Sequence, residues 1–197
     1  MSQLNSVQSS PGKSHSIDPN STLEAILEKL SKDQKDTFIP IQHIATGGTR
    51  HVYVIQKEQE DGTNQAEDGT NQKFILKYDR FGKDIANNKA DELLSKGNDT
   101  QHEGCVYFNM DPSPFVTFIK RNGTIQVAKK EIHYHVEEFV EGKTLEDFLT
   151  SIPKPLKQHE IALFFEDILR GVAHIHDAGF FHRDISPDNV MIEKKKR

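Results

Sequence analysis

The sequence HRDISPDNVMI, residues 182–192, carries the most chemical information in the chain. It places an acid, Asp184, and an amide, Asn189, five residues apart on one short loop. A carboxylate can accept the proton of a hydroxyl group, and an amide oxygen can bind a hard cation. Because the loop is short, we expect both side chains to face the same cleft. The alternative is a polar turn after a helix, in which Asp184 and Asp188 serve only as turn residues.

Two helices are predicted before this loop. The longer one runs from about Gln158 to Ala178, and Gly179 ends it. Its apolar residues recur at helical spacing, at Ile161, Phe164, Phe165, Ile168, Val172 and Ile175. The shorter one begins at Thr144, and a proline-containing break separates it from the longer helix.

Further upstream the pattern changes to strands. The segment IPIQHIATGGTRHVYVIQ, residues 39–56, predicts a strand, a turn at Gly47 and Gly48, and a returning strand. The next strand, FILKYD, is apolar except for Lys77, and a lysine in a buried strand is costly unless its ammonium group is paired. The alternative is an edge strand with Lys77 facing water. Between these strands, residues 59–72 duplicate EDGTNQ and predict a solvated hairpin tip without a catalytic role.

Together these three segments resemble the eukaryotic-type protein kinases of the Ser/Thr type. The loop is similar to the catalytic pattern H-R-D-x-x-x-x-N, and the strand is similar to V-A-I-K. The resemblance implies that Asp184 is the catalytic base and that Asn189 binds Mg²⁺. It also implies that Lys77 holds the phosphates of ATP and that Gly47 and Gly48 cover them.

The glycine hairpin is similar to the pattern G-x-G-x-x-G-x-V only in part. Val52 falls on the valine and Gly47 on the middle glycine, whereas Ala45 and Arg50 occupy the other two glycine positions. A further departure is Ser186, which stands where Ser/Thr kinases commonly carry a phosphate-contacting lysine.

The segment IHYHVEEFVEG, residues 132–142, predicts a strand with alternating faces. Its apolar residues share one face, and His133 and His135 share the other, which we expect to be at the surface. The segment resembles the fifth strand and hinge of a kinase, so that backbone groups of Glu138 and Val140 would bond the adenine. Glu137 would stand at the back of the adenine pocket, where the family usually has an uncharged residue.

The acid that pairs with Lys77 has two candidates, Glu103, which we prefer, and Glu92. Glu103 also suits a helix cap. After it, FVTFIKR, Asn122-Gly123 and TIQVAKK predict a strand, a turn and a strand.

Composition limits the remaining possibilities. The net charge is −5, so the chain has no excess of basic residues, which argues against a nucleic-acid partner. The single cysteine, Cys105, fits a reducing compartment, and no apolar run is long enough to cross a membrane, so we expect a cytoplasmic protein. Residues 1–20 predict disorder, and Ser21 is expected to cap a helix over residues 21–37.

The sequence therefore predicts an α+β, protein-kinase-like fold. An antiparallel small lobe with one helix covers residues 38–140, and the start of a mainly helical large lobe covers residues 141–197. The chain stops before the D-F-G motif that supplies another Mg²⁺ ligand in this family. We therefore expect an incomplete domain that is inactive alone and self-associates through an exposed large-lobe helix.

The resemblance implies a protein kinase that uses ATP and Mg²⁺ to phosphorylate Ser or Thr of a protein substrate that the sequence does not identify. One alternative is a small-molecule phosphotransferase of the aminoglycoside-kinase kind, which shares an H-x-D-x-x-x-x-N loop. A second is a pseudokinase or other non-catalytic interaction module, which the irregular glycine hairpin favours.

Overall fold

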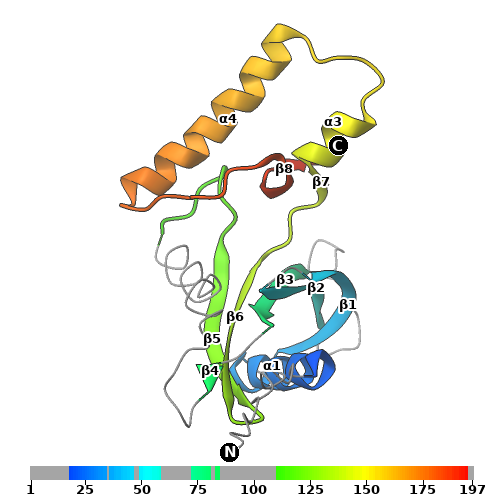
Figure 1. Ribbon diagram of the computed structural model, residues 1–197, viewed down its shortest axis with the longest axis vertical. Coiled ribbons are helices and arrows are strands. Elements are labelled where there is room, and N and C mark those ends of the chain that lie inside the picture. The colour runs from blue at the N-terminus through cyan, green and yellow to red at the C-terminus, as the bar shows by residue number, and fades with distance from the viewer. Residues whose placement is uncertain are drawn as a thin grey trace, which may run out of the picture.

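The computed structural model describes residues 18–34, 36–46, 49–58, 72–80, 83–84 and 110–194. In Figure 1 these residues form a lower part, in which helix α1 lies against a β-sheet, and an upper part with α3, α4 and the short strands β7 and β8. The predicted α+β architecture of a sheet-containing lobe followed by helices is confirmed.

The sheet is antiparallel, and the described residues contribute six strands to it. These are β1 (Thr37–Thr46), β2 (Arg50–Glu58), β3 (Lys73–Asp79), β4 (Lys83–Asp84), β5 (Ile119–Val127) and β6 (Lys130–Glu138). The spatial order is β1, β2, β3, β6, with β5 also paired to β6 and the two residues of β4 paired to the start of β6. The pattern around the glycine hairpin correctly predicted β1, β2 and β3, whereas β4 was not predicted.

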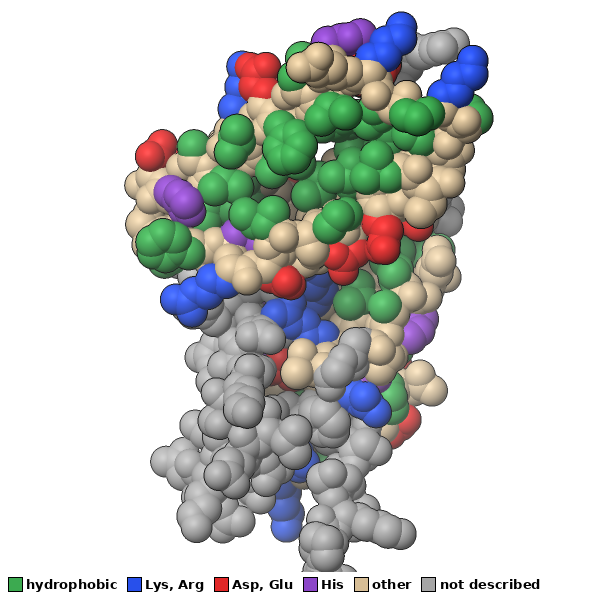
Figure 2. Space-filling view, turned by 45° about the horizontal axis from the view of Figure 1, so that its top comes forward, with side chains coloured by type: hydrophobic (Ala, Val, Ile, Leu, Met, Phe, Trp, Pro, Cys, Tyr) green, Lys and Arg blue, Asp and Glu red, His purple; other side chains and the backbone are tan. Residues whose placement is uncertain are grey.

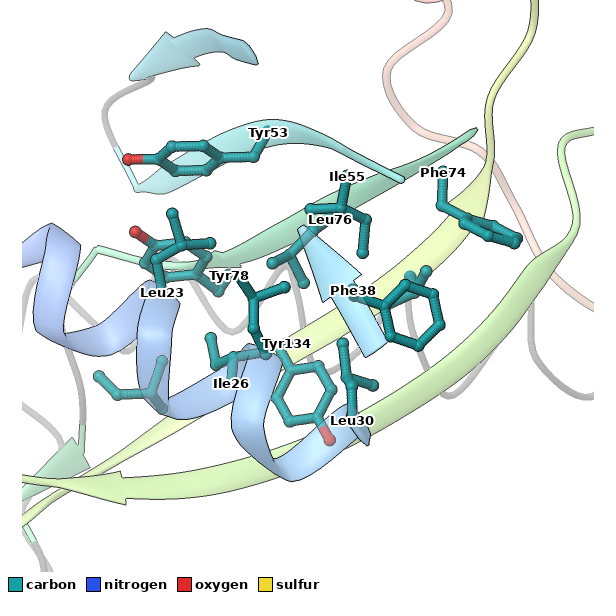
Figure 3. Close-up of a cluster of buried hydrophobic side chains, with 13 residues drawn as sticks. Leu23, Ile26, Leu30, Phe38, Tyr53, Ile55, Phe74, Leu76, Tyr78 and Tyr134 are labelled. Carbon is teal, nitrogen blue, oxygen red and sulfur yellow. The ribbon is translucent and has the colours of Figure 1, made fainter. Parts of the chain in front are cut away.

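Helix α1 (Pro19–Gln34) covers one face of this sheet. Figure 3 shows its leucines and isoleucine pointing at aromatic and aliphatic side chains of β1, β2, β3 and β6. The buried cluster contains Leu23, Ile26, Leu27, Leu30, Phe38, Tyr53, Ile55, Phe74, Leu76, Tyr78, Ile132, Tyr134 and Val136. The described part of the lower lobe thus has its core on the α1 side of the sheet.

The helix begins two residues before the expected Ser21 and ends before residue 37. The reason for the early start is Asp18, whose carboxylate accepts a hydrogen bond from the Ser21 backbone N–H at 2.9 Å. This bond lowers the pKa of Asp18 below its ordinary value. Asp18 is therefore the capping residue, and Pro19 fits the first helical position because it has no N–H to leave unpaired.

The opposite face of the sheet carries polar side chains among apolar ones, and several of these polar side chains are buried. His133 and His135 are only 8% and 0% exposed, and Asp79 and Glu137 are buried beside them. The expectation that the two histidines lie at the surface was therefore wrong. Alternation correctly assigned them to one face, but alternation cannot tell a solvated face from a covered one.

The turn between β5 and β6 also differs from the prediction. β5 runs without interruption through Asn122-Gly123, and the chain reverses at Ala128 and Lys129, whose φ angles are +49° and +66°. Gly123 instead lies against Tyr134 on β6. The contact leaves no room for a side chain at this position, since an added Cβ would lie 2.8 Å from the tyrosine hydroxyl oxygen. The strand also starts at Ile119 and not at residue 115, since residues 113–116 form a turn.

The upper part contains α3 (Leu145–Ser151) and α4 (Gln158–Asp177), both close to their predicted bounds. The side chain of Thr144 caps α3 by accepting from the Asp147 N–H at 3.0 Å. Gly179 follows α4 with φ of +84°, a conformation that glycine adopts without strain. The strands β7 (Gly142–Thr144) and β8 (Met191–Glu193) pair with each other and were not predicted.

The segment that leads into β5 packs against the C-terminal half of α4. Met110 and Ile175 form a small buried cluster with Val116 and Phe180 packed around it. The His174 ring nitrogen Nε2 lies 2.8 Å from the carbonyl oxygen of Asp111. These contacts fix α4 relative to the chain that enters the sheet.

Much of α4 is nevertheless exposed to solvent. Figure 2 shows apolar side chains gathered over the half of the molecule that holds α3 and α4. Leu163, Phe165 and Leu169 are each about three-fifths exposed. Among the described residues, no helix is both long enough and apolar enough to cross a membrane.

Candidate active site

The loop after α4 brings Asp184 and Asn189 together, as their spacing predicted. The Asn189 side-chain nitrogen Nδ2 donates to the Asp184 carboxylate oxygen Oδ2 at 2.9 Å and to the Asp184 carbonyl at 3.0 Å. It also donates to the Ser186 hydroxyl oxygen at 3.1 Å. Because the nitrogen makes these bonds, the amide is oriented, and its oxygen Oδ1 is left as the acceptor atom for a ligand.

The local backbone holds this loop in shape. Arg183 has φ of +65°, an uncommon conformation for a residue with a side chain. Pro187 then opens a single 3-10 turn, Pro187–Asn189, for which its fixed φ is suited. The Asn189 N–H closes this turn by donating to the Ser186 carbonyl at 3.0 Å.

The strands β7 and β8 anchor the end of the loop. The Leu145 N–H, at the start of α3, donates to the Val190 carbonyl at 2.7 Å, and the Lys194 N–H donates to the Glu141 carbonyl at 2.7 Å. Gly142 makes the close approach possible, because a Cβ there would overlap the carbonyl oxygen of Ile192. The sequence signal for this anchor was the apolar run after Asn189 together with Gly142.

Ser186 connects the polar groups of the loop. Its hydroxyl accepts from Asn189 and, as a hydrogen-bond partner of Asp188, lowers the pKa of that exposed carboxyl below its ordinary value. The sequence marked Ser186 as unusual for this loop, but its bond to Asn189 could not be foreseen from spacing alone.

A second group of predicted site residues lies in one cross-strand row of the sheet. Ala45 on β1 is opposite Val52 on β2, and Val52 is opposite Lys77 on β3. The row continues to His135 on β6. Residues directly opposite each other in antiparallel strands share a face, so Ala45, Val52 and Lys77 face the side of the sheet that α1 does not cover.

Lys77 forms an ion pair with an acid on the neighbouring strand. Its Nζ atom lies 2.8 Å from the Glu137 carboxylate oxygen Oε1, and the two side chains are only 23% and 10% exposed. Glu103 and Glu92, the predicted partners, lie outside the described residues, as do Gly47 and Gly48. The pairing of β3 with β6 would have indicated Glu137 as the partner of Lys77. Lys77 is opposite His135, and Glu137 is two residues further along β6 on the same face.

The two backbone positions expected to bond an adenine lie where the sheet meets the upper part. Glu138 ends β6, and Val140 follows it in the segment that runs from β6 up to β7 (Figure 1). The Glu138 N–H already donates to the Phe118 carbonyl at 3.1 Å.

The donor atoms of the loop suit a small hard cation. Asp184 and Asn189 offer a carboxylate and an amide oxygen, which are the ligand types that Mg²⁺ prefers. Within the described part of the chain, no group of three or more His, Cys, Asp or Glu side chains is arranged to hold a metal ion. A cation held by Asp184 and Asn189 would take its remaining oxygen ligands from water or from a bound molecule.

The loop lies between α4 and the sheet, as Figure 1 shows for the orange-to-red segment after α4. The arrangement offers a cation, Lys77, on the sheet, and a carboxylate with an oriented amide on the loop. A cation can bind phosphate oxygens, while the carboxylate can accept a proton from a nucleophile. These are the functions that phosphoryl transfer requires.

Comparison with known proteins gives an independent result. The model of the family described as protein kinase domain matches residues 70–197. The serine/threonine-protein kinase pkn2 of Myxococcus xanthus is 44% identical over 62 residues, which cover 32% of this chain and 7% of that protein. The serine/threonine-protein kinase PrkC of Bacillus subtilis is 40% identical over 63 residues, covering 32% of this chain and 10% of that protein. This chain thus spans only a small part of the length of these relatives.

Proposed function

Because the chain belongs to the protein kinase domain family, we propose that it acts in transfer of the γ-phosphate of ATP to Ser or Thr hydroxyls of proteins. The observation that carries this proposal is the hydrogen bond between Asn189 and Asp184, which joins a potential base to a potential metal ligand on one loop. The names of the similar bacterial kinases support Ser/Thr specificity.

Asp184 would act on the protein substrate. The hydroxyl oxygen forms a bond to the γ-phosphorus, the bond from that phosphorus to the oxygen of ADP breaks, and the hydroxyl proton passes to the Asp184 carboxylate. The exposure of Asp184 leaves it accessible to a substrate hydroxyl. The bonds from Asn189 orient the carboxylate for this step.

Lys77 and Asn189 would act on the nucleotide. The Lys77 ammonium group, which lies 2.8 Å from the Glu137 carboxylate, would hold the α- and β-phosphates. Asn189 would bind Mg²⁺ through Oδ1, and the bound ion supplies charge that offsets the negative phosphate oxygens. Ala45, Gly47, Gly48 and Val52 would cover the nucleotide, and the backbone of Glu138 and Val140 would bond the adenine.

Nucleotide binding by the chain is the first test. We expect millimolar ATP with Mg²⁺ to raise the melting temperature of the wild-type chain. The Lys77→Met and Asn189→Ala variants should show little or no shift, because each lacks one of the proposed contacts. A matched control is Lys120→Met on β5, which is exposed and outside the proposed site. Equal shifts in the wild type, the two site variants and the control would contradict the assignment.

Phosphoryl transfer is the second test. Labelled ATP is incubated with a generic protein substrate and, separately, with an aminoglycoside. Label on the protein that is lost in the Asp184→Asn variant supports the proposal, whereas label on the aminoglycoside supports the small-molecule alternative. Nucleotide binding without transfer to either would favour an incomplete domain or a non-catalytic module.

Two further properties are part of the proposal. The exposed apolar side chains of α4 support self-association through this helix. The single cysteine, Cys105, supports action in a reducing compartment such as the cytoplasm. The protein substrate is not identified by any of these residues.

A further inference from the structure

We propose that Glu137 positions Lys77 through an ion pair built within the sheet. This inference rests on the proposed function of Lys77 as the phosphate-binding lysine. It assigns a role to an acid that stands at a position where the sequence pattern led us to expect an uncharged residue.

The first support is the geometry of the pair. Lys77 Nζ and Glu137 Oε1 are 2.8 Å apart, a hydrogen-bonding distance between opposite charges. Both side chains are mostly shielded from solvent, at 23% and 10% exposed. An ion pair at this depth is less screened by water and salt than a surface pair, so it restrains the side chains more strongly.

The second support is the way in which the strands hold the two residues. On the paired strands β3 and β6, Lys77 is opposite His135 and Ile75 is opposite Glu137. Lys77 and Glu137 are therefore diagonal neighbours on the same face, a distance that two long side chains can span. The pairing of β3 with β6 fixes the backbone positions of both residues.

The third support is the surroundings of Glu137. Its other carboxylate oxygen, Oε2, lies 3.8 Å from Nε2 of His135, whose side chain is fully buried. The carboxylate is thus packed beside a rigid ring on its own strand. This packing limits the rotamers of Glu137 and gives Lys77 a fixed anchor.

Loss of the anchor has a specific consequence for the lysine. A lysine side chain has four rotatable bonds and loses considerable entropy when it is held in one place. With Glu137 in place, part of this loss has already occurred before a phosphate group binds. We therefore expect removal of the Glu137 charge to weaken phosphate binding by Lys77 and to make its amine more reactive.

Competitive lysine labelling tests the pair directly and needs no nucleotide. An acylating reagent reacts with a lysine amine that can leave its partner and meet the reagent, and the ion pair with Glu137 restrains the Lys77 amine. We expect the labelling rate of Lys77 to rise several-fold in Glu137→Gln, which keeps the size of the side chain and removes the charge that holds the amine. Lys29 and Lys120 in the same digest serve as internal references and should be unchanged.

The matched control is Glu131→Gln. Glu131 lies on the same strand and, by alternation, on the same face as Glu137, but at the other end of β6. It should leave the labelling of Lys77 at the wild-type rate. An unchanged Lys77 rate in Glu137→Gln, or an equal rise in Glu131→Gln, would overturn the proposal.

A double-mutant cycle then measures the effect on the nucleotide. Affinity for ATP with Mg²⁺ is compared in the wild type, Glu137→Gln, Lys77→Met and the double variant. We expect Glu137→Gln alone to weaken binding by about tenfold and to have no further effect once Lys77 is replaced. A Glu103→Gln variant is measured in parallel, and if it alone changes Lys77 labelling and affinity, then Glu137 is not the positioning residue.

The two measurements separate this inference from the proposed function. If the chain fails to bind nucleotide but the labelling of Lys77 depends on Glu137, the pair is real and the assignment of nucleotide binding is wrong. If nucleotide binds and depends on Lys77 but not on Glu137, the kinase assignment stands and the positioning role is refuted.

Discussion

The Tyr78 hydroxyl donates a hydrogen bond to the Pro19 carbonyl at 2.9 Å, which ties strand β3 to the first turn of helix α1. Burial raises the pKa of Tyr78 well above its ordinary value, so the phenol stays protonated and remains a donor. Lys77 is the preceding residue on the same strand. The α1 side of β3 is therefore held by core packing, while the other side presents the candidate phosphate-binding lysine.

Truncation of the α1 core should destabilise the whole described sheet. Ile26 is fully buried, so we expect Ile26→Ala to lower the free energy of unfolding by about 2–5 kcal/mol, measured by urea denaturation. Ile41→Ala is the matched control, because Ile41 is an isoleucine with an exposed side chain. If both variants lose the same stability, α1 does not contribute to the core in solution.

A methyl group at Gly123 should clash with Tyr134. The expected cost of Gly123→Ala is about 1–3 kcal/mol of unfolding free energy, because the tyrosine ring is buried and has little room to move. Adding Tyr134→Phe removes the nearest atom and should restore part of the loss. A Gly123→Ala variant as stable as the wild type would show that the ring does not occupy this place.

Stability should fall as the pH drops below about 6.5, partly because of His51. Burial, followed by the charges of Arg80 and His43, lowers the pKa of His51 below its ordinary 6.5. The unfolded chain then takes up a proton at a pH where the folded chain does not, so the stability present above pH 6.5 is lost as the pH falls. Urea denaturation at pH 7.5 and pH 5.5 measures this loss.

The control for this pH effect is a pair of glutamine variants. His51→Gln should show a smaller difference in stability between the two pH values than the wild type does. His159→Gln, at an exposed position on α4, should behave like the wild type. The assignment fails if His51→Gln keeps the full pH dependence.

Gly142→Ala should disturb the candidate site although Gly142 has no side chain to take part in the proposed chemistry. A Cβ would push β7 away from the Ile192 carbonyl and loosen the strand that follows Asn189. We expect weaker binding of ATP with Mg²⁺ and, since α3 begins at the end of β7, a lower melting temperature. Lys143→Ala, on the same strand but exposed, should change neither measurement.

Polar substitutions on α4 should reduce self-association. We expect the variant with Leu163→Gln, Phe165→Gln and Leu169→Gln to remain monomeric at concentrations where the wild type forms larger species in analytical ultracentrifugation. Because these side chains are exposed, the melting temperature should change little. Identical sedimentation of both proteins at every concentration would rule out this surface.

The sequence predicted the elements that have strong local signals. Thr144 and Gly179 marked helix ends through their own hydrogen bonding and backbone freedom, and these effects need no distant partner. The spacing of Asp184 and Asn189 correctly predicted that their side chains meet, because both residues lie on one short loop. Local chemistry was sufficient for these parts.

The remaining features depend on partners that are distant along the chain. Asn122-Gly123 has the composition of a turn, yet its glycine accommodates Tyr134 from the adjacent strand. The alternation of residues along β6 predicted that His135 lies at the surface, but its side chain is fully buried. The proximity of Glu137 to Lys77 required the pairing of β3 with β6, which spacing along the chain does not provide.

The range matched by the kinase family begins at residue 70, after α1, β1 and β2. In a protein shortened to that range, Leu76, Tyr78 and Tyr134 would be exposed to solvent, because the helix and the strands that cover them would be absent. Such a fragment should precipitate or bind nonspecifically even though it retains Lys77, Asp184 and Asn189. Recombinant work on this chain should therefore keep everything from Asp18 onward.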